Sequence, residues 1–561
     1  MRTAILLLIC CALFVTQRIS AQVIDWLHHY GEPGGLRVSG GFRLAADGEG
    51  HVFAAGEFFG SDFDLGGVQF VSDDDDWALL KYDAAGNLLW ARHILSTCWY
   101  SDLVDIRDLD YDPVNEQIVV TGYYSAPQQF PIDTLWGGCL EESYFGFVVC
   151  FDTEGNTLWA KQITGGQISI METSIASDGS VHVFGISRYG SATFQESPIL
   201  STPQGSFHAV YSSTGMLNSA QHLSGSAVDV YGGAVCADGS LVLCGWIKQA
   251  GSILGEPFAP SEGDTAAFVL KSDTSGSNID WIDVLPSTAS ASTGKCIILP
   301  NGPIIIAGGF QDDVIVQSDT LQSPAGISNG FITAIQLDGE IRWVRQLEST
   351  GVGGYASALD YDGADQLYLS TGYTGEMRLG GTIELPSVAQ RNGLIARIDT
   401  LGNWQAACVM GGTYRGNFVS IGPDGLFFSC GYDSTWTMGT TTVPYPVGSN
   451  ELYRTFLIIG KLDSLSGFTG ISTMPLQQEG GLHIYANPNK GTCTIDLPDQ
   501  LQLTPGLVLN IVDQNGQLVQ RVPVVYSPQG VAIDIRAQAR GIYHVELSDG
   551  RQRYTGKIVF E

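Results

Sequence analysis

The sequence predicts an all-β protein, in which a seven-bladed β-propeller closed by its N-terminal strand is followed by a small Ig-like β-sandwich. Three observations lead to this fold class. An acid–glycine–tryptophan phrase such as "DTEGNTLWAKQI" recurs along the chain. The 70 glycines are spread through aromatic and β-branched runs, which is typical of many short strands joined by tight turns. The two ends of the repetitive region each hold part of one repeat.

The repeated phrase defines the period. Its turn glycines follow one another roughly every 63 residues, and such a period indicates a repeat architecture. These glycines are Gly86, Gly155, Gly215, Gly276, Gly339, Gly402 and Gly467. Most copies have an aspartate shortly before the glycine, and four have a tryptophan after it, at Trp90, Trp159, Trp281 and Trp343. We interpret the aspartate and glycine as the turn and the tryptophan as an apolar plug in the core.

Each period contains four predicted strands and no helix, which is the pattern of a propeller blade. In the first period these are "FRLAAD", "HVFAAGEF", "WALLKYD" and "LLWARHI", with a glycine-rich excursion, "DLGGVQF", between the second and the third. The period is long for a minimal blade, so we expect the additional residues to lie in loops.

The ends of the repetitive region indicate closure. "VIDWLHHYG", at 23–31, matches a fourth strand without the three strands that should precede it, and the seventh repeat lacks a tryptophan strand after "KLDSLSGF". An N-terminal strand that completes the last blade would remove the exposed sheet edges of an open stack. The repeats resemble the SBBP family of bacterial propeller repeats, most clearly in "DGEGHVFAAGEFFGSDFDLGG" and the strands that follow it. The resemblance extends over residues 22–470.

The N-terminus has the pattern of a secretory signal peptide. Arg2 is followed by the apolar run "AILLLICCALFV", and a small residue precedes the cut that we place after Ala21. Ile9 disfavours a lipoprotein signal at Cys10 or Cys11. The run is too short for a stable transmembrane anchor, and no later segment is more apolar. The whole chain has a net charge of −31, and residues 1–21 carry no acid, so the mature chain excludes nucleic acid as a partner.

A second domain begins after a polar linker at 471–479. Residues 480–561 hold equal numbers of basic and acidic side chains, so the acidic excess lies in the propeller, residues 22–470. The short strands of this segment resemble the C-terminal sorting domain of the type IX secretion system, in "YANPNKGTCTI", "IVDQNGQLV", "GIYHVEL" and "GKIVF". Ala486 and the final Glu561 depart from the usual family pattern. The matching positions are Tyr485, Asn487, Pro488, Gly491, Gly541, Tyr543 and Lys557.

That resemblance implies export through the periplasm and across the outer membrane by the type IX machinery. It also implies removal of the tail, followed by secretion or surface attachment, in a Bacteroidetes-type bacterium.

No catalytic motif occurs in the sequence. The acidic run Asp73, Asp74, Asp75 and Asp76 is placed in a loop before a third strand, where clustered carboxylates could hold calcium or simply face solvent. His28 and His29 point to opposite faces of the closing strand and lack a third zinc ligand. A two-residue turn at Asp238-Gly239 would place Cys236 and Cys244 on opposite sheet faces, so we interpret both as buried thiols. We expect no cofactor other than a possible calcium ion.

Two functions therefore compete. The first is a monomeric, non-catalytic scaffold, secreted or on the cell surface, whose long aromatic loops bind an extracellular glycan or protein. The second is a polysaccharide-active hydrolase or lyase, which requires two carboxylates from different blades to meet in one pocket. Sequence alone favours the scaffold and does not identify the ligand.

Overall fold

The computed structural model contains strands and no helix among the residues it describes. This confirms the prediction of an all-β protein. The chain divides into two compact units, Met1–Ile471 and Ser472–Glu561. The predicted signal peptide, 1–21, lies outside the described residues. These are 24–30, 37–38, 40–59, 63–65, 68–70, 75–96, 104–125, 127–130, 134–135, 144–194, 200–258, 265–300, 302–317, 319–380, 383–413, 416–439, 441–445, 455–462, 479–497, 508–512, 518–524, 530–548 and 553–561.

Each of the first six repeats forms four antiparallel strands that pair in chain order. Repeat 1 holds β3 (Arg43–Ala46), β4 (Val52–Phe59), β7 (Asp75–Tyr82) and β8 (Leu88–Ser96), with β2 (Arg37–Val38) beside β4. Repeat 2 holds β9 (Val104–Asp112), β10 (Gln117–Tyr124), β13 (Phe145–Asp152) and β14 (Thr157–Gly165). Repeat 3 holds β15 (Ile168–Ile175), β16 (Val181–Ser187), β19 (Gly205–Tyr211) and β20 (Leu217–Ser224).

The next three repeats follow the same plan. Repeat 4 holds β21 (Val228–Val235), β22 (Leu241–Ile247), β25 (Ala266–Ser272) and β26 (Ile279–Leu285). Repeat 5 holds β27 (Ser290–Ile298), β28 (Ile304–Gln311), β31 (Ser328–Ile335) and β32 (Ile341–Ser349). Repeat 6 holds β33 (Gly353–Tyr361), β34 (Gln366–Tyr373), β37 (Asn392–Asp399) and β38 (Trp404–Thr413).

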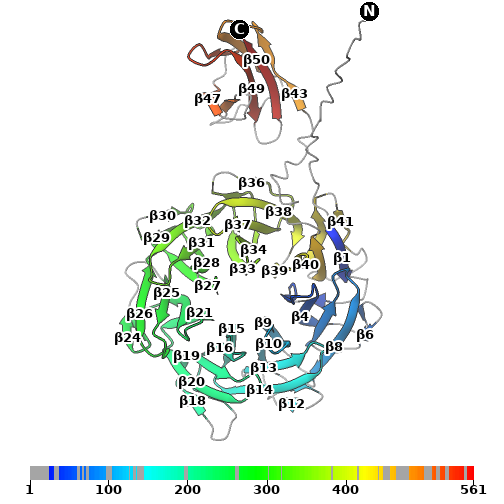
Figure 1. Ribbon diagram of the computed structural model, residues 1–561, viewed down its shortest axis with the longest axis vertical. Helices are drawn as coiled ribbons and strands as arrows, with labels where there is room; N and C mark the ends of the chain where they lie inside the picture. The colour runs from blue at the N-terminus through cyan, green and yellow to red at the C-terminus, as the bar shows by residue number, and fades with distance from the viewer. Residues whose placement is uncertain are drawn as a thin grey trace, which may run out of the picture. The chain divides into compact units, whose positions relative to one another are not determined.

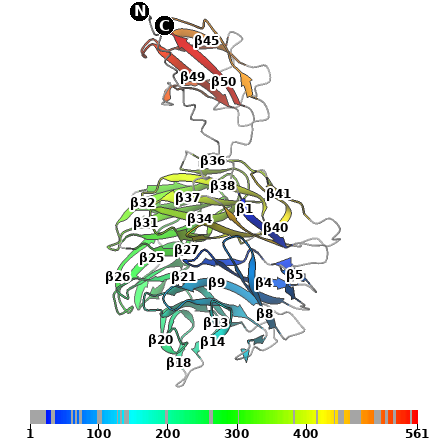
Figure 2. The same cartoon turned by 45° about the vertical axis from the view of Figure 1, so that its right-hand side comes forward.

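The seventh repeat draws its fourth strand from the other end of the unit. It has β39 (Phe418–Gly422), β40 (Gly425–Met438) and β42 (Phe456–Leu462), and β42 pairs antiparallel with β1 (Ile24–Tyr30). Each first strand contacts the first strand of the next repeat, and β39 contacts β3. The contacts therefore run full circle, and the sheets surround a common centre in Figure 1. The blue β1 lies at the edge of the gold sheet of the seventh repeat in Figures 1 and 2, next to β42, which in turn pairs with β40.

The excursions between second and third strands form hairpin arms, although we expected loops. The arm strands are β5 (Phe63–Leu65), β6 (Val68–Phe70), β11 (Gln128–Gln129), β12 (Thr134–Leu135), β17 (Ala192–Phe194), β18 (Leu200–Thr202), β23 (Gly251–Ile253), β24 (Glu256–Phe258), β29 (Asp313–Val316), β30 (Asp319–Gln322), β35 (Met377–Leu379), β36 (Ile383–Leu385) and β41 (Thr441–Val443). Four arms pair with the fourth strand of the preceding repeat, as β11 does with β8, β17 with β14, β23 with β20 and β35 with β32. The end of β40 pairs with β38 in the same way. These arms cover sheet edges that would otherwise be open to pairing with another chain.

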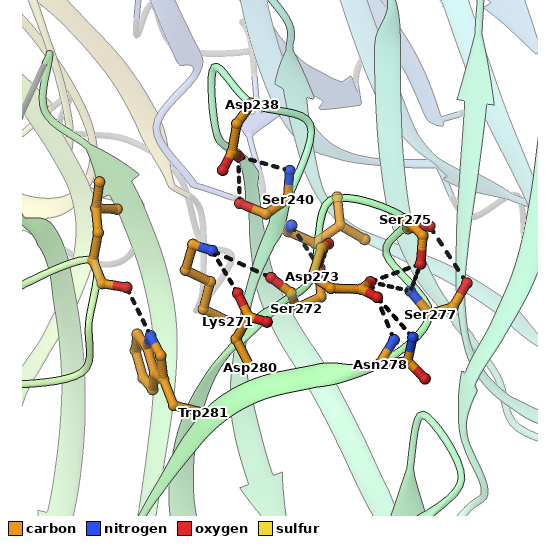
Figure 3. Close-up of polar contacts among 12 residues, drawn as sticks. Asp238, Ser240, Lys271, Ser272, Asp273, Ser275, Ser277, Asn278, Asp280 and Trp281 are labelled. Atoms are coloured by element: carbon orange, nitrogen blue, oxygen red, sulfur yellow. Dashed lines mark hydrogen bonds and ion pairs between the residues drawn. The ribbon is translucent and has the colours of Figure 1, made fainter.

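The repeated phrase is a clasp between neighbouring repeats. In repeat 4 the carboxylate of Asp273 accepts hydrogen bonds from Ser277 and Asn278, which closes the turn (Figure 3). Gly276 has a φ of +69°, in the left-handed region that favours glycine. Trp281 donates its Nε1–H to the carbonyl of Leu337, in the turn of the next repeat, at 2.9 Å.

The same clasp recurs around the unit. Trp90 and Trp343 likewise donate to the carbonyls of Thr153 and Thr400. Trp26 of the N-terminal strand donates to the carbonyl of Ala84, so the closing strand clasps repeat 1 as the other tryptophans clasp their neighbours. Trp159 and Trp343 are buried in apolar clusters, as expected for core plugs, and Trp90 and Trp281 are partly buried. The indole N–H adds a tie between repeats that the sequence did not predict.

The turn after β21 corrects the predicted cysteine geometry. The amide of Cys236 donates to the carbonyl of Ser240 at 2.8 Å, which makes the loop three residues long rather than two. Cys236 and Cys244 therefore lie on the same face and share one apolar cluster with Cys296. All three are free and buried, as expected for thiols that pack as apolar groups.

The C-terminal unit contains two sheets around one apolar cluster. One sheet has the order β43 (Glu479–Gly481), β50 (Arg553–Phe560), β49 (Gly541–Ser548), β46 (Val508–Val512) and β47 (Leu518–Pro523). The other has the order β44 (His483–Tyr485), β45 (Thr492–Asp496) and β48 (Val531–Asp534). Ile495 and Ile533 come from the smaller sheet and pack with Ile511, Val545 and Ile558 from the larger one.

Candidate functional site

Residues from the first strands of all seven repeats line a charged cavity of about 430 Å³. Arg43, Asp108, Asp110, Glu172, Lys295 and Asp360 all face it. We call this the charged cavity. Lys295 Nζ lies 2.8 Å from a Glu172 carboxylate oxygen and 3.9 Å from one of Asp108. Burial lowers the pKa of Lys295, but these two acids outweigh it, so the pKa is raised and the ammonium is retained.

Two other acids of the charged cavity have raised pKa values. Burial, followed by the charge of Asp108, raises the pKa of Asp110 to about 7. Burial raises the pKa of Asp360 to about 6. Desolvation disfavours an ionised carboxyl, so both groups take up a proton more readily than an exposed aspartate does.

Most of these polar groups tie neighbouring first strands together. Asp108 accepts a hydrogen bond from the amide of Thr173 at 2.9 Å, and Asp360 accepts one from the amide of Ile421 at 2.8 Å. Ser420 accepts one from the amide of Ala46 at 3.0 Å. These amides lie on the innermost edges of the sheets, and a buried amide without an acceptor is costly. Carboxylates from different repeats do meet in one cavity, but Asp108 and Glu172 bind Lys295 and Asp108 also holds a strand edge.

A second pocket, of about 360 Å³, is lined by residues of the first strands of repeats 4, 5 and 6 and of the second strands of repeats 4 and 5. We call it the aromatic pocket. Its walls are Tyr231, Trp246 and Tyr355, and its other lining residues are Ser292, Thr293, Gly294, Ala307, Gly308 and Ala356. Tyr231 and Trp246 meet edge to face at an interplanar angle of 86°, with centroids 5.7 Å apart. Tyr355 is 43% exposed, so one aromatic wall is open to a ligand.

Buried contacts hold these aromatic walls in place. Trp246 donates its Nε1–H to Asp229 at 3.1 Å, and Asp229 is only 2% exposed. Lys248 Nζ lies 2.6 Å from the same carboxylate and Arg188 lies 3.6 Å from it, so the buried charge is neutralised. A Cβ on Gly309 would lie 2.1 Å from the Tyr355 ring, so only glycine permits the ring to lie there.

The predicted calcium residues lie partly outside the described chain. Asp73 and Asp74 are among the residues not described, and β7 begins at Asp75 rather than after the acidic run. Asp76 is 2% exposed and is bound by His93 Nε2 at 2.6 Å and by the amide of Ser96 at 2.7 Å. Asp76 is thus a buried strand residue with partners of its own, and the expected solvated loop position is wrong for it.

Two other polar groups, of which the sequence suggested only the histidine pair, are a turn and a strand contact. Within the described ranges, Asp47, Glu49 and His51 form the one group close enough to hold a metal ion. The Asp47 carboxylate accepts hydrogen bonds from the backbone amides of Glu49 and His51, as is typical of an aspartate that begins a turn. His28 binds the carbonyl of Gly86 at 2.7 Å, whereas His29 is exposed on the opposite face.

One of the predicted sorting-motif residues, Asn487, holds the last strand described in the C-terminal unit. Asn487 donates to the carbonyl of Lys557 at 2.6 Å and accepts from the amide of Val559 at 2.7 Å. Gly491 has a φ of +95°. Tyr543 is buried and donates its hydroxyl to the carbonyl of Ala539. Tyr485, Pro488, Gly541 and Lys557 are exposed, and Pro488 follows Asn487 in the same segment.

Residues 483–561 match the family described as the secretion system C-terminal sorting domain. This confirms the predicted tail, and the protein is exported across the outer membrane by the type IX system, to be secreted or attached to the surface. Among the described residues, no helix has the length and apolarity needed to span a membrane.

Two solved structures are similar to this chain at low levels. One is described as a protein of unknown function from Dyadobacter fermentans, with 10% identity and a TM-score of 0.34, covering 79% of this chain and 98% of that one. The other is described as the BSP domain of a biofilm associated protein, with 8% identity and a TM-score of 0.12, covering 95% and 96%. Neither similarity is close enough to support an argument. No curated protein matches the sequence.

Sequence reasoning did not find the aromatic pocket. Its aromatic walls come from repeats 4 and 6, and Tyr231 and Tyr355 are more than a hundred residues apart. The one available signal was that Trp246 lies outside the repeated phrase. A period alone does not reveal which aromatic residues share a rim.

Proposed function

We propose that the protein is a secreted seven-bladed β-propeller that acts as a non-catalytic binding scaffold for an extracellular glycan. The closed circuit of first-strand contacts and the pairing of β1 with β42 support seven blades with N-terminal closure. The four-strand repeats and their aspartate–glycine turns support kinship with SBBP repeats. The scaffold works as a monomer, because its own arms cover several sheet edges.

The aromatic pocket is the observation that carries the binding function. Exposed aromatic surface beside hydroxyl groups suits sugar rings, whose faces are apolar and whose edges are polar. The three aromatic walls lie on sheets built by antiparallel pairing rather than on free loops, so they are preorganised for binding.

A catalytic function is the second candidate, favoured by the meeting of carboxylates in the charged cavity. Glycosidases use two carboxyl groups about 5 to 10 Å apart, one as acid and one as base or nucleophile. Asp110, with a pKa raised to about 7, has the protonation behaviour of a general acid. Asp108 and Glu172, however, both contact Lys295, so neither is free to act as the second carboxylate beside Asp110.

A binding screen separates the two functions. The mature full-length protein should be tested against soluble extracellular polysaccharides and purified matrix proteins, with release of reducing ends measured on the same polysaccharides. Saturable polysaccharide binding without turnover supports the scaffold. Turnover that is lost in Asp110→Asn would replace it with the enzyme. Binding only to proteins, or to nothing in the panel, would overturn the glycan scaffold.

A further inference from the structure

Resting on the proposed glycan-binding function, we propose that the aromatic pocket binds one pyranose ring of a neutral polysaccharide. Its volume of about 360 Å³ and its three aromatic walls fit a compact ring rather than an extended face. The two tyrosines and the tryptophan come from β21, β22 and β33, so the site draws on repeats 4 and 6 across repeat 5.

The lining of the pocket selects against charge. None of the residues that line it is ionised at neutral pH, and Ser292 adds a hydroxyl to those of the two tyrosines, whereas the buried Thr293 hydroxyl bonds the carbonyls of Gly245 and Phe268. The carboxylate that Trp246 binds, that of Asp229, is buried and already binds Lys248. Lys248 lies 5.2 Å from the Trp246 ring and is engaged by this acid, which Arg188 also approaches at 3.6 Å. The negative net charge of the protein also repels acidic glycans.

Gly294 provides a way to fill the pocket without disturbing its walls. It lies at the bulge between Thr293 and Lys295, and a Cβ built on it would meet no atom within 4 Å. Its backbone is not in the left-handed region, so a larger residue is not strained there. The open space beside Gly294 is therefore pocket space, and a leucine side chain would occupy the volume assigned to the sugar.

Gly48 is the matched control. A Cβ there also meets nothing within 4 Å, and Gly48 lies in the turn after β3, at the charged-cavity end of the first strands. Gly294→Leu and Gly48→Leu thus place the same side chain in open space at different ends of the ring. If both variants have the melting temperature and the circular dichroism spectrum of the unmodified protein, neither substitution perturbs the fold.

The test measures affinity of the full mature chain for neutral dextran, xylan and β-glucan, and for acidic alginate and pectate. We expect neutral glycans alone to bind, Gly294→Leu to abolish binding, and Gly48→Leu to leave it unchanged. Removing a stacking ring in Tyr355→Ala should weaken binding by about 3- to 10-fold, and Tyr355→Phe should restore most of it.

Retained glycan binding in folded Gly294→Leu would overturn the pocket assignment and leave the scaffold function standing. Tighter binding of alginate or pectate than of the neutral glycans would overturn the neutral ligand class. If the unmodified protein binds no glycan at all, the proposed function fails first and this inference fails with it.

Discussion

Trp159 and Gly215 form the clasp between repeats 2 and 3, and their coupling can be measured. Trp159 is 7% exposed, donates its Nε1–H to the carbonyl of Ser213 at 2.9 Å, and packs its ring over Gly215. Truncation in Trp159→Ala should reduce the free energy of unfolding by about 3–5 kcal/mol. Trp159→Phe keeps an aromatic ring and loses the donor, so it should cost only about 1 kcal/mol.

Gly215→Ala tests the close approach directly. A Cβ there would lie 2.6 Å from the Trp159 ring, and the φ of +81° disfavours any other residue. The left-handed backbone costs about 1–2 kcal/mol and the overlap adds about 1–3 kcal/mol. In the Trp159→Ala background the overlap disappears, so only the backbone cost should remain. The double-mutant cycle should therefore give a coupling energy of about 1–3 kcal/mol.

Urea unfolding of the full mature chain, followed by circular dichroism, gives the four free energies of unfolding. Additive effects of the two substitutions, within about 0.5 kcal/mol, would refute the clasp, because residues without contact do not couple.

Four further outcomes are expected. Deleting β1 should lower the melting temperature more than replacing the β29–β30 arm with a short glycine–serine link. The reason is that β1 both completes a sheet and binds repeat 1 through Trp26. Equal decreases in melting temperature would contradict closure by this strand. The pKa values of Asp110 and Asp360 are raised to about 7 and about 6, against a usual 3.8. The stability that their protonated forms contribute is therefore complete below about pH 4 and is lost as the pH rises through 6 to 7. Asp110→Asn should flatten this fall in the free energy of unfolding. Asn487→Ala removes two hydrogen bonds to the last strand and should reduce export of a reporter carrying a signal peptide and residues 480–561; unchanged export would show that Asn487 is not required. If Asp73 and Asp74 hold calcium, added calcium should raise the melting temperature of the unmodified chain and not that of the doubly asparagine-substituted variant.

Local chemistry made part of this fold predictable. The aspartate and glycine of each phrase act within a few residues, since Asp273 bonds to Asn278 and Gly276 adopts a positive φ in the same turn. Hydrophobic alternation between such turns then identifies four strands in each period. The unmatched strand at 23–31 identified the partner of the last sheet, and the order of motifs in the tail identified the sorting domain. Each of these signals is short-range, or is repeated often enough to be read without coordinates.

Only the tertiary structure decided how the repeats meet. The arms pair with preceding repeats, and the tryptophans donate to carbonyls about sixty residues away, as Trp90 does to Thr153. Sheet edges and carbonyls need hydrogen-bond partners, and the packing of neighbouring repeats determines which partners are within reach. A one-residue difference in loop length brought Cys236 and Cys244 onto one face. Contacts between repeats likewise decided that Asp108 and Lys295 line one charged cavity and that Tyr231, Trp246 and Tyr355 line one pocket. The sequence by itself determined the strands, the period and the route of export, which depend on local pattern. The proposed binding surface depends on which residues of distant repeats lie side by side, and only the tertiary structure decides that.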